Sequence, residues 1–398
     1  MEVKIIDLDH KGNGICRIDN KIVFIPKTII GDIVDVDIVK CHKKYDSGRI
    51  NKIICGSEDR IESLCPYYYV CGGCNISNLN YNKQLEYKKN KIINIFKRYL
   101  NMDINPDIIG SDNRYEYRNK ITYKCIDGKL GLVSIDNDII NIDRCYLVSD
   151  KVNKLYECIS KEDLSKVSKV VVKECNNGLI LSIDGEFCID NVKDKCLSIY
   201  INGKCVYKWA DGYINIGDIK YKVSLDSFFQ VNTDNIARLY DVVLKYGEFN
   251  KDDKVIDLYC GVGSISLYVS RYVDSVLGIE IINDAILDAQ DNAKLNNILN
   301  TKFICGDVSK LFDESVYGNK IIVDPPRTGL DNNTIDVLNK IDVDKLIYVS
   351  CDPMTLVRDL SKLDKYKIED VTLIDMFPQT HHVESVVCLS RIDSDMQF

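Results

Sequence analysis

The sequence predicts a multidomain protein: a small N-terminal β-barrel, a central α+β domain and a C-terminal α/β domain. At 398 residues the chain is too long for one ordinary hydrophobic core. Its first part contains closely spaced short strands with alternating polarity, and its last part alternates buried strands with helices. We therefore expect the barrel over residues 1–54, the central domain over 55–222 and the α/β domain over 223–398.

The composition is that of a folded soluble protein, and the chain's length and missing signal favour reduced thiols. Hydrophobic residues make up 45% and charged residues 28% of the chain. No apolar run approaches the roughly 18 residues that a membrane span needs, and the N-terminus has no apolar signal core. The 17 cysteines are therefore expected to be free thiols, many of them small core residues. We expect a cytoplasmic monomer without a membrane partner.

The N-terminal region has the pattern of a small closed barrel, a class that often binds oligonucleotides. Gly, Asn and Pro separate the alternating segments, and a purely structural β-domain is the alternative. The expected strands lie in VKIIDL, GICRID, KIVFIP, DIVDVDIVK and SGRINKII.

The charge is unevenly distributed along the chain. A net charge of −8 argues mildly against a nucleic-acid partner. Between Lys83 and Arg98, however, six basic residues accompany one acidic residue, Glu86. A local basic face can bind phosphate on an acidic protein, so the overall sign does not decide the matter.

The central region begins with a cysteine-rich loop, CPYYYVCGGC, followed by an expected helix from Asn82 to Leu100. Three of its cysteines have metal-ligand spacing: Cys65, Cys71 and Cys74. A closed site needs a fourth thiolate, and by chemistry alone Cys55, Cys125 or Cys145 could provide it. Four thiolates suit tetrahedral zinc as well as an iron–sulfur cluster. Residues 150–222 show no recognisable chemistry.

The C-terminal region reads as a doubly wound parallel sheet, in which ligands bind beyond the carboxyl ends of the strands. The first strand, VIDLY, runs into the glycine-bearing turn CGVGSISLYVS, where Gly261 lets the backbone approach a ligand closely. The following strands are expected in VLGIE, KFICGD, KIIVDPP, KLIYVSC and SVVCLSRI.

Acidic residues follow three consecutive strands of this sheet. Glu280 can accept hydrogen bonds from both ribose hydroxyls, and Asp307 is placed for the adenine side of a nucleoside. Asp324 ends the next strand, where a carboxylate would favour a sulfonium and repel a pyrophosphate. Ser266 also replaces the third glycine of a dinucleotide-binding turn. The set therefore favours S-adenosylmethionine over a nicotinamide dinucleotide.

Cys351 ends the fifth strand, beside the expected cofactor cleft. A thiolate that adds to C6 of uracil makes C5 nucleophilic enough to take a methyl group. A base must then remove the C5 proton, and Glu384, just before the last strand, is the candidate. The alternatives are a packed core thiol and an exposed glutamate.

Several motifs resemble the RNA uracil-5-methyltransferase family, especially its bacterial 23S ribosomal RNA members. Upstream, CPYYYVCGGC and Cys145 match the family's iron–sulfur motif, and the barrel looks like its RNA-binding TRAM domain. The resemblance spans nearly the whole chain. The matching segments downstream are SFFQVN, DLYCGVGSISL, GIE, GD, DPPRTGL, SCDPMTLVRDL and DMFPQTHHVE.

The resemblance implies roles for individual residues and an RNA substrate. Cys351 would be the nucleophile, Glu384 the base and Phe228 an aromatic beside the target base. A [4Fe–4S] cluster would be structural or contact RNA, and 23S ribosomal RNA is the expected substrate, with transfer RNA as the alternative. Ser264 departs from the asparagine of several members. The implied cofactor contacts are Gln230, Tyr259, Glu280, Asp307 and Asp324, and the implied cluster ligands are Cys65, Cys71, Cys74 and Cys145.

Two other functions compete with this reading. Exocyclic-amine methyltransferases carry an aromatic after the Asp/Asn-Pro-Pro motif, where this chain has Arg327. An RNA-binding assembly factor with a relict cofactor pocket would not need the complete acidic series or Cys351.

Overall fold

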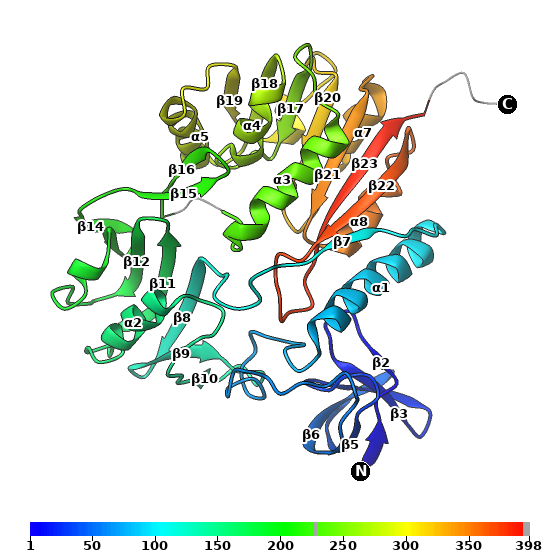
Figure 1. Cartoon of the computed structure of the whole chain (residues 1–398), viewed down its shortest axis with the longest axis vertical. Coiled ribbons are helices and arrows are strands. Elements are labelled where there is room, and N and C mark those ends of the chain that lie inside the picture. Colours follow the sequence, from blue (N-terminus) through cyan, green and yellow to red (C-terminus); the bar gives the residue numbers. More distant parts are fainter. Residues whose placement is uncertain (226–228, 393–398) are drawn as a thin grey trace.

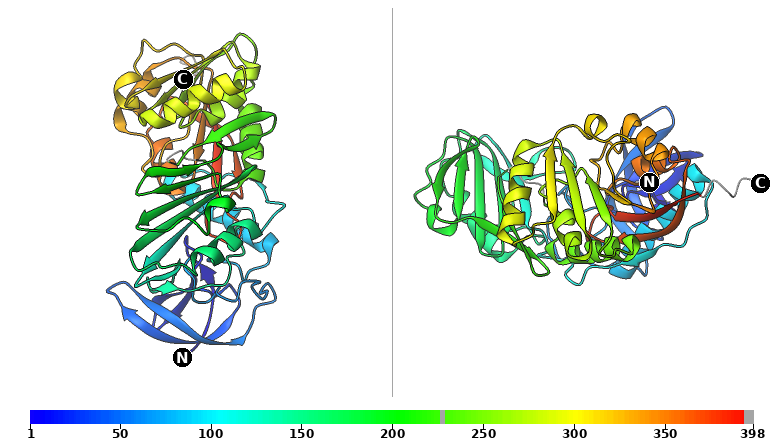
Figure 2. Two further views of the ribbon diagram at one scale, coloured as in Figure 1. Left: turned by 90° about the vertical axis from the view of Figure 1, so that its left-hand side faces the viewer. Right: turned by 90° about the horizontal axis from the view of Figure 1, so that it is seen from above.

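The computed structural model describes residues 1–225 and 229–392 and shows an elongated molecule (Figures 1 and 2). The N-terminal barrel and the C-terminal domain lie toward opposite ends, and the central sheet lies between them in the side view of Figure 2. Phe228, predicted to lie beside the target base, falls outside the described residues. No helix in the described ranges is long and apolar enough to cross a membrane.

The N-terminal barrel closes because its first segment pairs with two different strands. In the sheet order β1-β5-β6-β4-β3-β2, the two edge strands are consecutive in the chain. Between them, Ile5 N donates to Asp32 O and Ile6 N to Ile15 O, both at 2.8 Å. The strand expected in VKIIDL is thus divided in two. The strands are β1 (Glu2–Lys4), β2 (Asp7–Leu8), β3 (Gly14–Ile18), β4 (Lys21–Ile25), β5 (Ile33–Cys41) and β6 (Tyr45–Cys55).

Helix α1 (Tyr81–Leu100) lies between the barrel and the C-terminal sheet (Figure 1). Asn80 caps it by accepting a hydrogen bond from Lys83 N at 3.1 Å. Its buried Ile92 and Phe96 belong to a hydrophobic cluster of the C-terminal domain. The following strand, β7 (Asp107–Ile109), pairs with β22 of that domain. Both elements fall within the range that the sequence assigned to the central domain, yet they pack on the C-terminal one.

The central sheet has the order β10-β9-β8-β11-β12-β13-β14. Helix α2 (Asp150–Ile159) buries Leu155 and Ile159 in the same cluster as Val170 and Leu181 of the sheet. The strands are β8 (Lys120–Ile126), β9 (Lys129–Val133), β10 (Ile139–Ile140), β11 (Val167–Cys175), β12 (Gly178–Gly185), β13 (Ser198–Ile201) and β14 (Lys204–Lys208). A short helix η1 (Lys193–Lys195) and the hairpin β15 (Gly212–Ile216)–β16 (Ile219–Val223) complete this region.

The C-terminal domain confirms the predicted α/β sheet, whose order is β19-β18-β17-β20-β21-β23-β22-β7. The strands β17 to β21 are parallel, whereas β23 runs antiparallel to β21 and β22. The beginning of β23 therefore lies at the edge where the parallel strands end. The strands are β17 (Lys254–Leu258), β18 (Ser275–Glu280), β19 (Thr301–Cys305), β20 (Lys320–Val323), β21 (Lys345–Ser350), β22 (Tyr366–Ile374) and β23 (Glu384–Arg391).

Helices cover this sheet in the order expected for a doubly wound fold. The buried residues of α3 and α4 join one hydrophobic cluster, while those of α7 and α8 join another. The helices are α3 (Thr233–Gly247), α4 (Ser264–Val269), η2 (Ser270–Tyr272), α5 (Asn283–Leu295), α6 (Val308–Leu311), α7 (Asn332–Lys340) and α8 (Pro353–Leu360).

Candidate active site

The turn after β17 opens the predicted cofactor site. Tyr259 and Gly261 have positive φ angles of 64° and 53°, so the chain reverses sharply before α4. A Cβ at Gly261 would meet nothing within 4 Å, which leaves room for a ligand to approach the backbone. The phenolic hydroxyl of Tyr259 donates to Asp331 Oδ2 at 3.2 Å, so its ring is held at the rim of the turn.

The carboxylates of Glu280 and Asp307 are held by backbone donors. Glu280 accepts from Gly261 N at 3.2 Å and from Ile282 N at 2.9 Å, one bond to each oxygen. Asp307 accepts from the backbone N and the hydroxyl of Ser309 at 3.1 and 2.8 Å. Each carboxylate is thereby fixed at a strand end and keeps further lone pairs for ligand hydroxyl or amine groups.

Asp324 and Asp257 form an acidic pair at the centre of the edge. Burial, helped by the nearby charge of Asp257, raises the pKa of Asp324 to about 7. Burial likewise raises the pKa of Asp257 to about 7, although Ser266 Oγ donates to its carboxylate at 2.5 Å. A bound cation would be favoured beside two such acids. Sequence reasoning did not single out Asp257, whose only signal was its place in the motif DLYCGVGSISL.

Gln230 lies in the segment that leads into α3. It is 9% exposed, and its carbonyl accepts from Asn119 Nδ2 at 3.0 Å. Asn119 Nδ2 also donates to Thr233 Oγ1 at 3.0 Å. The central region therefore fixes the backbone around Gln230 against the C-terminal domain.

The strand register brings Cys351 and Glu384 together. Ser350 pairs with Ser385 in the antiparallel ladder of β21 and β23, so the next position places Cys351 opposite Glu384. Glu384 is 1% exposed, whereas Cys351 is half-buried. The two predicted catalytic residues thus meet at the edge where the acidic residues lie.

Both residues of this pair have pKa values raised above their ordinary range. Burial raises the pKa of Glu384 to about 8, helped by Asp324 and opposed by Arg327. Among the described residues, Glu384 Oε2 is buried and has no hydrogen-bond partner. Burial, Glu384 and Asp324 raise the pKa of the Cys351 thiol to about 12, again against Arg327. Unpartnered buried acids of this kind are typical of catalytic sites.

Asp359 and Arg358 connect the two motifs that carry the site, a role that the sequence reasoning missed. The buried Asp359 carboxylate accepts from Leu330 N and from the Tyr348 hydroxyl, both at 2.7 Å. Arg358 Nη2 donates to Thr328 O at 2.8 Å. These bonds fix the loop after β20 to α8, and with it the positions of Asp324 and Cys351. The sequence contained a signal for these residues, because Arg358, Asp359 and their partners lie within or beside the motifs DPPRTGL and SCDPMTLVRDL.

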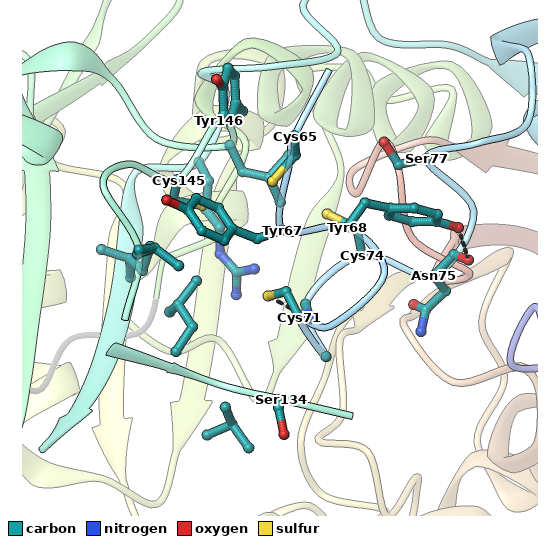
Figure 3. Close-up of a pocket in the computed structure, with 18 of the residues that line it drawn as sticks. Cys65, Tyr67, Tyr68, Cys71, Cys74, Asn75, Ser77, Ser134, Cys145 and Tyr146 are labelled. Atoms are coloured by element: carbon teal, nitrogen blue, oxygen red, sulfur yellow. Dashed lines mark hydrogen bonds between the residues drawn. The ribbon is translucent and has the colours of Figure 1, made fainter. Parts of the chain in front are cut away.

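The four cysteines of the predicted cluster line one cavity of about 790 Å³ between the barrel and the central sheet (Figure 3). Cys145 shares this cavity with Cys65, Cys71 and Cys74, whereas Cys55 is exposed and Cys125 is buried elsewhere. In the part of the chain that the structure describes, no group of three or more His, Cys, Asp or Glu side chains is arranged to hold a metal ion.

A buried lysine of the barrel faces these cysteines. Lys27 is 4% exposed, and its ammonium donates to the carbonyls of Cys71, at 2.8 Å, and Cys74. Burial raises the pKa of Cys74, and the other three thiols raise it further while Lys27 opposes them. An anionic group held by four thiolates would gain a nearby cation here. Four thiols beside a buried lysine are therefore the donor types of a thiolate-bound cluster, although the described side chains are not arranged as a metal site.

Comparisons with known proteins agree with these features. Residues 208–392 match the family model described as tRNA (Uracil-5-)-methyltransferase, and residues 1–50 match the TRAM domain. An uncharacterised RNA methyltransferase of Clostridium acetobutylicum is 32% identical, with 98% of this chain and 97% of that protein covered. A second, of Halalkalibacterium halodurans, is 33% identical, with 98% and 96% covered.

One solved structure shares the whole architecture. The tRNA (uracil-54, C5)-methyltransferase of Pyrococcus abyssi, in complex with S-adenosyl-L-homocysteine, superposes with a TM-score of 0.81. It is 24% identical, and the match covers 98% of this chain and 100% of that one. At this identity the likeness shows the fold. Together with the relatives and the two matched domains, it establishes that the chain belongs to the S-adenosylmethionine-dependent RNA uracil-5-methyltransferase family and carries an N-terminal TRAM domain.

Proposed function

We propose that this protein methylates carbon 5 of a uracil in RNA, with Cys351 as nucleophile and Glu384 as base. The observation that carries the proposal is the pairing of a thiol with a buried carboxylate at the edge of the sheet, whose Oε2 has no hydrogen-bond partner among the described residues. The acids Glu280, Asp307 and Asp324 line the same edge. An exocyclic-amine methyltransferase would need neither residue of the pair.

The residues act in a fixed order. Cys351 Sγ bonds to C6 of the uracil, and the electron pair of the C5–C6 double bond moves toward C5 and O4. The residues that would hold S-adenosylmethionine are Gln230, Tyr259, Gly261, Glu280, Asp307 and Asp324, and the bound cofactor would supply the methyl group that C5 takes. Glu384 then accepts the C5 proton, the double bond re-forms and the Sγ–C6 bond breaks, so the thiolate is regenerated.

The protonation states set two requirements on this sequence. With a pKa near 12 the Cys351 thiol is protonated at neutral pH, so it must ionise when substrate binds beside Arg327. With a pKa near 8, Glu384 acts as a base only in its ionised fraction. Proton removal from C5, and with it release of the methylated RNA, should therefore become faster as the pH rises toward about 8.

The two catalytic residues should fail differently. Cys351→Ala should form no covalent RNA complex and transfer no methyl group. Glu384→Gln keeps the nucleophile, so it should accumulate an RNA adduct that survives denaturation and carries the labelled methyl group. A denaturing gel with methyl-labelled cofactor makes the measurement, and 5-fluorouridine RNA should trap the unaltered enzyme as a positive control. Normal turnover by Glu384→Gln would refute the base assignment.

We propose 23S ribosomal RNA as the substrate, from the barrel, the cysteine motif and the family members that the sequence resembles most. Transfer RNA is the substrate named for the Pyrococcus abyssi protein of the same fold. Mapping 5-methyluridine in both RNA classes, from cells with and without the protein, distinguishes them. Loss of the modification only from transfer RNA would overturn the ribosomal assignment.

We also propose that Cys65, Cys71, Cys74 and Cys145 hold a [4Fe–4S] cluster, because four thiolates beside a buried lysine suit an anionic cluster. Such a cluster would have a structural or RNA-contacting role, since methyl transfer moves no net electrons. Anaerobically purified protein should contain about four irons with matching sulfide. Cys145→Ser should lose the iron, whereas the matched Cys125→Ser should keep it. Stoichiometric zinc without iron would contradict the assignment.

A further inference from the structure

The segment 375–383 connects β22 to β23 and leads directly into Glu384. It is held mainly by groups that come from distant parts of the chain. At its beginning, the fully buried Asp375 accepts from Lys88 Nζ at 2.6 Å and from the Tyr81 hydroxyl at 2.8 Å. Lys88 also donates to Phe377 O at 3.0 Å. Helix α1 thus anchors the first half of this segment, which we call the base loop.

Gln379, in the middle of the base loop, has a left-handed backbone with φ of 70°, a conformation that costs free energy in a residue other than glycine. Its carbonyl accepts from Asn75 N and Ile76 N at 3.0 and 3.2 Å. Its backbone N donates to Gln84 Oε1 at 3.0 Å, and its side chain bonds Gln84 Nε2 at 3.0 Å. The strained turn is therefore maintained by neighbours outside the base loop.

Asn75 and Ile76 directly follow the segment CPYYYVCGGC, and we call residues 65–76 the cysteine loop. Asn75 follows Cys74 directly, and its side-chain Oδ1 lies 2.8 Å from Nδ1 of His381, three residues before Glu384. Because an amide oxygen can only accept, the imidazole N–H is the donor. A Cβ at Gly12 of the barrel would lie 2.8 Å from Ile76 and 3.7 Å from the His381 Cβ. The barrel, the cysteine loop and the base loop thus meet at one tight junction.

The cysteine loop is fixed on its other side by the proposed cluster site. Cys71 and Cys74 line the cavity with their side chains, while their carbonyls accept from Lys27. Three hydrogen bonds then run from the next two residues to Gln379 and His381. A change at the cysteines therefore has a short, hydrogen-bonded route to the base loop.

We propose that Asn75 is a positioning residue, through which the filled four-cysteine site holds the base loop and thereby sets the position of Glu384. The inference rests on the proposed function for its catalytic consequence, but the structural link can be measured separately. Without the link, Cys351 still adds to the uracil and cofactor binding is retained. Proton removal slows, because Glu384 is no longer held at C5.

Hydrogen–deuterium exchange tests the structural link between the cysteine loop and the base loop, and adduct trapping tests its effect on proton removal. In anaerobically prepared, iron-containing Asn75→Ala protein, exchange of a peptide covering 376–386 should be roughly fivefold faster, as expected for one lost net hydrogen bond. The same variant should accumulate several times more methyl-labelled RNA adduct during turnover than the unaltered protein. Peptides of β17 and β21 should exchange as before, which shows that the domain is folded. Asn191→Ala, which removes an exposed bond to Glu162 elsewhere in the central region, is the matched control.

Two further variants decide the interpretation. Asn75→Asp keeps an oxygen that can accept from His381, so its exchange over 376–386 and its adduct level should match the unaltered protein. If Asn75→Ala acted only by loosening the packing, Asn75→Asp would not restore these two measurements. Cys71→Ser should lose iron and show the same faster exchange over 376–386. Unchanged exchange of this peptide in Asn75→Ala or in iron-free Cys71→Ser would overturn the link. Faster exchange without adduct accumulation would overturn the positioning of Glu384. If the unaltered protein methylates no uracil, the proposed function fails while the exchange result still stands.

Discussion

The two ends of the base loop bury a carboxylate in opposite ways. At the anchored end, Asp375 is fully buried, but a lysine and a tyrosine hydroxyl from α1 donate to it. At the other end, Glu384, the proposed base, is almost as buried, and its Oε2 has no hydrogen-bond partner among the described residues. The paired acid holds the chain in place, whereas Oε2 of Glu384 is left available for a proton. Burial alone therefore does not distinguish an acid that anchors the chain from one that can exchange a proton; the partners of the acid do.

The largest effect should come from breaking the anchored pair. Lys88→Met leaves the Asp375 charge buried without its partner, and the free energy of unfolding should fall by about 3–5 kcal/mol. Chemical denaturation measures this loss.

Lys97→Met is the matched control in the same helix. Its partner is Asp103, and both side chains are largely exposed, so this variant should lose less than about 1 kcal/mol. Equal losses in the two variants would mean that the Lys88–Asp375 pair is not the anchor of the base loop.

Lys88 also shows where sequence reasoning reached its limit. It was counted with the basic residues between Lys83 and Arg98 as part of a phosphate-binding face. Its partner lies 287 positions away, and Lys91 likewise donates to His381 O, 290 positions away. Charge patterning is local and cannot reveal such partners, so two of these lysines hold the base loop instead.

The parts that were predictable depend on local pattern or on chemistry. Strand alternation predicted the small barrel and strand–helix alternation predicted the α/β sheet, and both are confirmed. The pairing of Cys351 with Glu384 was anticipated from the reaction, although the motif alone could not give the register that joins them. Helix α1 and β7 were assigned to the central domain by chain order, but their apolar residues pack on the C-terminal sheet. Packing across domains has no local sequence signature.

A smaller effect on stability, of opposite sign, is expected at Glu384. The pKa of Glu384 is raised from 4.5 to about 8, so the folded protein retains a proton that the unfolded chain loses. The contribution of Glu384 to the free energy of unfolding is therefore fully present below about pH 4.5 and is lost as the pH rises toward 8. Glu384→Gln removes this titration. Relative to the variant, the unaltered protein should lose roughly 2 kcal/mol between about pH 6 and pH 8, at about 1.4 kcal/mol per pH unit.

Denaturant unfolding of both proteins across this pH range makes the measurement, and the difference between the two curves isolates residue 384. Glu314→Gln replaces an acid whose side chain is 64% exposed, so its stability should follow the unaltered protein at every pH. Parallel curves for Glu384→Gln and the unaltered protein would mean that Glu384 carries its charge in the folded state. Diverging curves would show that the fold holds Glu384 at a cost in stability at higher pH, because its buried Oε2 has no hydrogen-bond partner among the described residues.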